Sequence, residues 1–304
     1  MSRIFEALQK SEEERSGVSF PAPLSLATDL LQNAERQRDE SFTAPTREEL
    51  AAEEQSLSQR PEELDQFPQL PINLWSGSRL ICLTNQESLG AEKFRFLAVK
   101  LRQIQQARPL KRLLVTSSIP EEGKSMVCGN LAAVLARKKQ QRTLLLEGDL
   151  RRPVLASRFG LGKVPGLTEW LEADSAPVSN IYQLAGAGLW FMPAGAPPEN
   201  PLELMQSGKL AGLLAQLSQW FDWIVIDTPP LLPLADTSLW SRLADGVLLV
   251  AREGVTQKRQ LQRGLEVVEQ TKLLGMVLNS SSNSEHDSYY QRYGPLAPQT
   301  AEKF

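Results

Sequence analysis

Hydrophobic and polar positions divide the chain into a front with little apolar pattern, a long patterned middle and a polar end. Residues 16–75 are rich in Pro, Ser, Gln and Glu and show no sustained periodicity, which is typical of a flexible tether. Before them, residues 3–15 place Ile4, Phe5 and Leu8 on one face of a short predicted helix. This helix either docks on a partner or frays in solution.

From residue 76 onward, short apolar runs alternate with segments of helical periodicity. We expect helices over 91–107 and 124–138 and within 200–220, and strands over 111–118, 142–149, 189–195, 223–230, 246–252 and 273–279. The strand runs are nearly continuous in apolar character, as expected of strands that are buried on both faces. The pattern therefore predicts an α/β fold, a mostly parallel sheet covered by helices on both faces, with ligands at the carboxyl ends of its strands.

These patterns predict three parts: an acidic segment over 1–75, a folded domain over 76–280 and a polar, aromatic tail over 281–304. No apolar run reaches the roughly 20 residues needed to cross a bilayer. The N-terminus also lacks the long apolar core and cleavage site of a secretory signal. We therefore expect a cytoplasmic chain.

Composition adds a contrast in charge between the parts. The chain has 304 residues, of which 41% are hydrophobic and 23% charged, an ordinary soluble composition. Residues 1–75 hold 7 Lys/Arg and 15 Asp/Glu, a net charge of −8, which leaves 26 against 21, or +5, for the remainder. A mildly basic body suits an anionic ligand such as ATP, although ordinary surface variation gives the same balance. Cys82 and Cys128 lack metal-ligand spacing and are predicted to be reduced packing residues.

A phosphate-binding loop is predicted where "TSSIPEEGKS" joins a strand to a helix. Its pattern is Ser118-x4-Gly123-Lys124-Ser125, with a small serine in place of the usual first glycine. Backbone N–H groups and the helix N-terminus supply the positive end that phosphate needs. Lys124 can reach the outer phosphates, and Ser125 can ligate Mg²⁺.

The loop is unusually acidic, because Glu121 and Glu122 directly precede Gly123. Their side chains need not face the phosphates, since backbone groups make the cradle. Two carboxylates beside ATP weaken the attraction for phosphate unless they point to solvent, hold magnesium through water or pair with a base.

Three further carboxylates follow predicted strands. Glu147 and Asp149 end the run "LLLEGD", and Asp227 ends "WIVID". A hard cation such as Mg²⁺ prefers oxygen ligands, which Ser125 and a strand-end aspartate supply directly or through water. The carboxylates also offer a general base for a hydroxyl nucleophile.

Together these segments resemble the bacterial tyrosine kinases, or BY-kinases, of capsule and exopolysaccharide assembly. "TSSIPEEGKSMVCGNLA", "LLLEGDLRRP" and "FDWIVIDTPP" are similar to their Walker A, Walker A′ and Walker B motifs, and the resemblance spans about residues 78–280. It implies a P-loop NTPase fold of the MinD/ParA-like kind and an ATP- and Mg²⁺-dependent autokinase.

The resemblance also implies the site residues. Lys124, Glu147, Asp149 and Asp227 are the implied catalytic set, with Glu147 or Asp149 accepting the proton. Ser125, Asp149 and Asp227 are the implied metal ligands. The implied nucleotide-binding residues are Ser118, Glu122, Gly123, Lys124, Ser125, Met126, Arg252 and Asn279. Glu147 departs from the family, whose second motif begins with aspartate, and Glu121 stands where the family loop commonly has glycine.

The tail carries Tyr289, Tyr290 and Tyr293, three of the four tyrosines of the chain. The resemblance implies that they are phosphorylated in trans by neighbouring subunits. Without the kinase motifs, the same cluster would suggest a docking segment.

The family assembles rings through a helix with the pattern Glu-x2-Arg-x2-Arg. Glu92 and Arg95 match its first two positions and are the expected oligomer interface, but Ala98 takes the third. Arg102, one turn later, is a possible substitute. A homo-oligomer is therefore expected, and its ring form is left open.

Two other functions compete with the kinase. Positioning ATPases of the MinD and ParA type carry a signature lysine where this chain has Ile119, and they lack a terminal tyrosine cluster. A scaffold that binds ATP without transferring phosphate would explain Glu147, Glu121 and Ala98. For the kinase, the resemblance implies a membrane-spanning polysaccharide co-polymerase as activator, a place at the inner face of the plasma membrane through that partner, and no nucleic acid partner.

Overall fold

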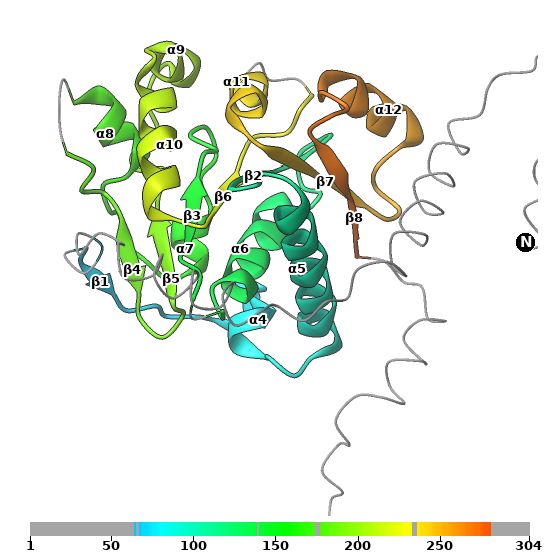
Figure 1. The fold of residues 1–304 in the computed structure, drawn as a ribbon, viewed down its shortest axis with the longest axis horizontal. Coiled ribbons are helices and arrows are strands. Elements are labelled where there is room, and N and C mark those ends of the chain that lie inside the picture. Colours follow the sequence, from blue (N-terminus) through cyan, green and yellow to red (C-terminus); the bar gives the residue numbers. More distant parts are fainter. Residues whose placement is uncertain (1–63, 65–66, 139, 174–176, 233–235, 281–304) are drawn as a thin grey trace, which may run out of the picture. The chain divides into compact units, whose positions relative to one another are not determined.

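The computed structural model describes residues 64, 67–138, 140–173, 177–232 and 236–280 (Figure 1). The chain divides into two units, residues 1–59 and 60–304, and every described residue belongs to the second. The predicted helix over 3–15, most of the predicted tether and the tyrosine tail lie outside the described residues.

In the described part of the chain, one eight-stranded sheet has the order β1-β4-β5-β3-β6-β2-β7-β8 (Figure 1). The strands are β1 (Gln69–Leu70), β2 (Arg112–Ser117), β3 (Thr143–Glu147), β4 (Tyr182–Leu184), β5 (Leu189–Met192), β6 (Trp223–Asp227), β7 (Gly246–Arg252) and β8 (Leu273–Asn279). All neighbouring strands pair in parallel except β4 and β5, which are antiparallel. The central strands β3, β6 and β2 therefore end at the same edge.

Helices cover both faces of this sheet. On one face pack α4 (Ile81–Thr84), α5 (Leu89–Ala107), α6 (Lys124–Leu135) and α7 (Leu155–Arg158). On the other pack α8 (Leu167–Glu172), α9 (Pro201–Gln206), α10 (Lys209–Trp220), α11 (Asp236–Leu243) and α12 (Lys258–Val267). A short 3-10 turn, η2 (Ser76–Ser78), precedes α4. The predicted fold class is confirmed.

Successive side chains of each central strand point to opposite faces of the sheet, which explains why helices cover both faces. In β2, Leu113 and Val115 belong to the core under α5 and α6, whereas Leu114 belongs to the core under α10 and α11. All three side chains are fully buried. Because successive residues of a strand point to opposite faces, a strand that is apolar at every position needs helices on both sides.

The domain begins earlier than residue 76, where the sequence pattern places it. Phe67 is buried against Trp220, with ring centroids 6.0 Å apart, and β1 pairs with β4. The segment predicted as one helix within 200–220 is two helices, α9 and α10, separated at Gly208, whose φ of 79° is left-handed.

Cys82 and Cys128 are both buried and unpaired, as predicted for packing residues. Burial raises the pKa of both thiols. Among the described residues, no helix combines the length and the apolar character that crossing a bilayer requires.

Candidate nucleotide-binding site

The phosphate-binding loop, residues 118–123 and here called the P-loop, joins the end of β2 to the start of α6. Its last residue, Gly123, has a φ of 91°, and a Cβ there would lie 2.2 Å from Asn279 Nδ2. Glycine is thus required by both conformation and space. The turn leaves the first N–H groups of α6 at the carboxyl edge of the sheet, where they attract anions.

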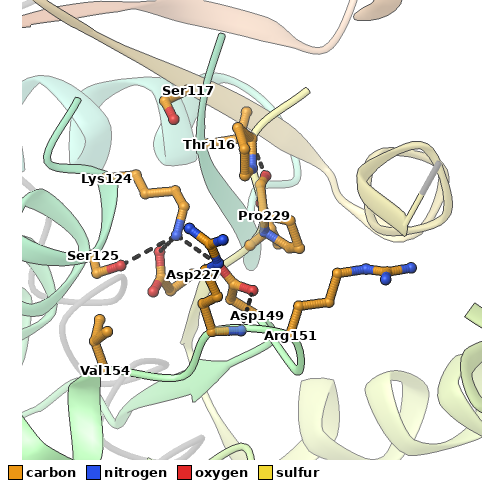
Figure 2. Close-up of polar contacts among 12 residues, drawn as sticks. Thr116, Ser117, Lys124, Ser125, Asp149, Arg151, Val154, Asp227 and Pro229 are labelled. Atoms are coloured by element: carbon orange, nitrogen blue, oxygen red, sulfur yellow. Dashed lines mark hydrogen bonds and ion pairs between the residues drawn. The ribbon is translucent and has the colours of Figure 1, made fainter. Parts of the chain in front are cut away.

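Lys124 lies close to side chains from the ends of two strands and from the first turn of α6 (Figure 2). Its Nζ lies 2.8 Å from Asp149 Oδ2, 3.3 Å from Ser125 Oγ and 3.7 Å from Asp227 Oδ1. Burial disfavours the ammonium, but the charges of Asp227 and Asp149 outweigh burial and raise the pKa of Lys124. The structure therefore holds a charged lysine between two carboxylates.

Asp227 is the most desolvated carboxylate of this group. It is fully buried, and within the described residues neither of its carboxylate oxygens accepts a hydrogen bond. Burial raises its pKa, and the ammonium of Lys124 opposes that rise. A buried carboxylate without hydrogen-bond donors is costly unless a cation compensates it. With the hydroxyl of Ser125 nearby, this oxygen set fits Mg²⁺.

Asp149 belongs to the A′ turn, residues 148–154, which follows β3. Its Oδ2 accepts from Lys124, and its Oδ1 accepts from the backbone N–H of Arg152 at 3.1 Å. The turn is fastened to α11 because Arg151 donates to both carboxylate oxygens of Asp236, at 2.5 and 3.1 Å. Asp149 is therefore held in place by its own turn.

Glu147 does not join the cluster around Lys124 through any contact of the described residues. Its Oε1 accepts from the backbone N–H of Val154 at 2.6 Å and of Leu155 at 2.5 Å, and its Oε2 accepts from that of Ala194 at 3.2 Å. Burial raises the pKa of its carboxyl to about 7, although these three N–H groups lower it. Its carboxylate thus joins the A′ turn to the loop after β5.

The two glutamates of the P-loop differ in their surroundings, and neither forms an ion pair with Lys124. Glu121 is exposed, with a φ of 66° that explains why glycine is common at this position. Glu122 is fully buried and accepts from the N–H of Ile119 at 2.9 Å and from the hydroxyl of Thr256. The acidic loop is therefore compatible with nucleotide binding, since one carboxylate meets solvent and the other fixes the loop.

Ser118 opens the P-loop with its side chain buried. Its φ is not positive, so its backbone conformation does not require glycine. Its hydroxyl has no hydrogen-bond partner among the described residues. A Cβ on Gly264 of α12 would lie 2.6 Å from this hydroxyl oxygen. The serine therefore fits because α12 carries glycine opposite it.

Three further residues of the predicted nucleotide set lie on or beside the P-loop. Asn279 Nδ2 donates to the carbonyl of Glu122 at 2.9 Å, and Nη1 of Arg252 lies 3.5 Å from the carbonyl oxygen of Glu121. Met126 is in the first turn of α6 and packs against the core under α5. The structure thus places them next to the loop.

Sequence reasoning missed Thr256 and Asp236, the partners of Glu122 and Arg151. Each lies more than 80 positions from its partner along the chain. Local spacing carries no signal for such pairs. The one hint was that each follows a predicted strand by a few residues, where ligand-side loops begin.

The predicted oligomer residues lie on α5. Glu92 and Arg95 form an ion pair on its surface. Ala98 is fully buried, and Arg102 donates to the carbonyl of Leu135 at 3.2 Å, near the end of α6. Arg102 is therefore engaged within the domain. Tyr289, Tyr290 and Tyr293 lie outside the described residues.

No family model matches the chain. Over 219 residues the chain is 32% identical to the tyrosine-protein kinase YwqD of Bacillus subtilis (strain 168), an overlap of 70% of this chain and 92% of that protein. Over 225 residues it is 31% identical to the tyrosine-protein kinase wzc of Salmonella typhimurium, an overlap of 73% of this chain and 31% of that protein. The chain thus spans nearly all of the first relative and about a third of the second.

Among solved structures, the kinase domain of the Escherichia coli tyrosine kinase ETK is similar, with a TM-score of 0.63 and 28% identity over 72% of this chain and 86% of that one. Similarity in sequence along nearly a whole relative thus agrees with similarity in fold. The chain belongs to the bacterial tyrosine-protein kinase family and is a protein-tyrosine kinase built on the P-loop α/β fold.

Proposed function

We propose that this kinase transfers the γ-phosphate of ATP to Tyr289, Tyr290 and Tyr293 of neighbouring copies of the same chain. The observation that carries the proposal is the cluster of Lys124, Asp149 and Asp227 at the N-terminus of α6. The backbone of the P-loop binds the phosphates, and Lys124 carries the positive charge that attracts the outer ones. Such positioning and charge stabilisation account for most catalysis of phosphoryl transfer.

Ser125 and Asp227 are the residues that would hold Mg²⁺, because one offers a hydroxyl and the other a buried carboxylate whose oxygens accept no hydrogen bond from the described residues. Asp149, which already binds Lys124, completes the acidic side of the site. When bound, Mg²⁺ supplies charge that balances the phosphates and the charge that develops on them.

In the transfer step, the hydroxyl oxygen of the acceptor tyrosine forms a bond to the γ-phosphorus. The bond from that phosphorus to the oxygen bridging the β- and γ-phosphates breaks, and ADP leaves with the electron pair. The proton of the tyrosine passes to a carboxylate. Asp149 suits this role better than Glu147, because the carboxylate oxygens of Glu147 accept from the backbone N–H groups of Val154, Leu155 and Ala194.

The wider role rests on the family. We propose that the kinase regulates capsule or exopolysaccharide polymerisation and export, and that the cytoplasmic end of a membrane-spanning polysaccharide co-polymerase activates it. That partner would bring the chain to the inner face of the plasma membrane. The homo-oligomer is proposed because Glu92 and Arg95, on the surface of α5, match the first two positions of the family's ring motif. Ala98 is buried and Arg102 is bonded within the domain, so the third position of that motif lacks its arginine.

Lys124→Met tests the site. We expect phosphate incorporation into tyrosine to fall at least about 100-fold, since the charge that neutralises the outer phosphates is lost. The full-length chain is incubated with ATP and Mg²⁺, with and without the cytoplasmic segment of the co-polymerase, and phosphotyrosine is mapped by mass spectrometry. Lys138→Met, the same change at the opposite edge of the sheet, is the matched control. Phosphotyrosine in the Lys124 variant at the control's level would show that the site is wrongly assigned.

A further inference from the structure

A cavity of ≈ 610 Å³ is lined by residues that follow β3 and β5. Its walls come from the A′ turn, the segment 161–165 and the loop after β5. Four of its lining residues are prolines: Pro153, Pro165, Pro193 and Pro197. Rigid apolar rings of this kind form a surface on which an aromatic side chain packs with little loss of entropy.

Two buried or half-buried carboxylates hold these walls in place. Glu147 joins the A′ turn to the loop after β5 through the N–H groups described above. Glu169 accepts from the N–H of Gly166 at 2.6 Å and from that of Ala196 at 2.9 Å, which ties that loop to α8. The cavity is therefore preformed by bonds within the domain.

The sheet order places this cavity next to the transferred phosphate. Along the carboxyl edge, the P-loop follows β2, Asp227 follows β6 and Asp149 follows β3. The cavity follows β3 and β5, so it is the next position in the row. Because neighbouring strands are about 4.8 Å apart, its near wall is roughly one strand spacing from Asp149.

Three charged side chains line the cavity: Lys163, and the carboxylates of Glu147 and Glu169, which both accept from backbone N–H groups. Among the described residues that line it, Lys163 is the single cation, and its side chain is exposed. The tail of this chain reads "EHDSYYQRYG", in which Asp287 precedes Tyr289 by two positions. An aromatic ring packed against the prolines, with an acidic residue two positions earlier, would complement both the apolar wall and Lys163.

We infer that this cavity is the docking site for the acceptor segment 287–293 of the chain, with a tyrosine ring against the prolines and Asp287 paired with Lys163. The inference rests on the proposed function, because it names how the acceptor reaches the phosphate. Chain length permits docking on a neighbouring copy: nine extended residues from Ser280, which follows β8, to Tyr289 span about 30 Å, enough for the tyrosines to project beyond their own domain.

The test separates enzyme from substrate. The substrate is the full-length Lys124→Met chain, which cannot transfer phosphate. The enzyme is the full-length chain with Tyr289, Tyr290 and Tyr293 changed to Phe, which cannot accept it. With Lys163→Glu in the enzyme, we expect the KM for the substrate chain to rise about tenfold, while kcat and the KM for ATP stay unchanged.

A charge swap and a cavity-filling change make the result specific. Asp287→Lys in the substrate should bring the KM of the Lys163→Glu enzyme back to within about threefold of the original. Ala196→Trp in the enzyme should raise the KM for the substrate about tenfold by occupying the cavity. Ala196→Ser and Lys138→Glu are the matched controls and should leave the KM unchanged.

The outcomes discriminate between the two proposals. An unchanged KM in both Lys163→Glu and Ala196→Trp would overturn the docking site while leaving the kinase assignment intact. Absence of phosphotyrosine with the enzyme that keeps Lys163 and Ala196 would overturn the proposed function, and the docking site with it.

Discussion

At the scale of single residues, the most informative position is Glu147. The family has aspartate there, and a longer side chain could displace a catalytic carboxylate by about an ångström. In the structure, the longer side chain of Glu147 lets its carboxylate accept hydrogen bonds from the backbone of both the A′ turn and the loop after β5. Glu147 is thus better explained as a positioning residue than as the proton acceptor.

Glu147→Gln is expected to destabilise the domain by about 2–3 kcal/mol. The amide has one acceptor oxygen, so its NH₂ group would face either the N–H of Ala194 or those of Val154 and Leu155, and a charge-assisted hydrogen bond would be lost. Urea unfolding measures the change in the free energy of unfolding, and steady-state kinetics measure kcat on the same sample.

Asp149→Asn is the comparison for that variant. Asp149 has few bonds beyond Lys124 and the N–H of Arg152, so its loss should lower kcat about 100-fold or more with a change in stability of about 1 kcal/mol or less. The positioning role of Glu147 fails if Glu147→Gln abolishes kcat and leaves the unfolding midpoint where it was.

At the scale of elements, the P-loop is shaped by a helix that follows it by more than 130 residues. Gly264 of α12 lies against Ser118, and a Cβ at Gly264 would lie 2.6 Å from the serine oxygen and 3.2 Å from its Cβ. The P-loop therefore accommodates serine at its first position only because α12 has glycine opposite it.

The pair can be tested with a double-mutant cycle. Gly264→Ala alone is expected to destabilise the domain by about 1–3 kcal/mol, because the clash outweighs the gain of up to about 1 kcal/mol from replacing glycine in a helix. In a Ser118→Gly background the clash is absent, so the same change should be neutral or stabilising. Unfolding midpoints of the four proteins give the coupling energy. Equal effects of Gly264→Ala in both backgrounds would contradict the contact.

At the scale of the whole molecule, the central sheet and the P-loop could be predicted, and the sheet's β1 and β4 could not. Apolar runs buried on both faces give a strong local signal, and the motif residues of the site stand directly at their ends. Strands β1 and β4 have 2 and 3 residues, too few for a periodic pattern, and they form through pairing with partners distant in the sequence. Thr256 and Asp236 could not be predicted for the same reason, because their partners Glu122 and Arg151 are distant in the sequence.

The position at which the domain begins is set by β1, the edge strand next to β4. Leu64 and Phe67 are buried in the core under α10, and the carbonyls of Pro68 and Leu70 accept from the N–H groups of Gln183 and Ala185, each at 2.9 Å. A chain cut at residue 76 would lose two buried side chains, worth about 1.5–3 kcal/mol each, and expose β4 as an unpaired edge.

We therefore expect residues 76–304 to be less stable than residues 60–304 by about 3–6 kcal/mol, a large part of the 5–15 kcal/mol typical of a domain. Urea unfolding of both chains measures the difference. Phe67→Ala in the 60–304 chain should account for about half of it, because the ring packs on Trp220, whereas Gln69→Ala, at an exposed position two residues later in β1, should change little. Equal midpoints for the two chains would place the boundary at residue 76 after all.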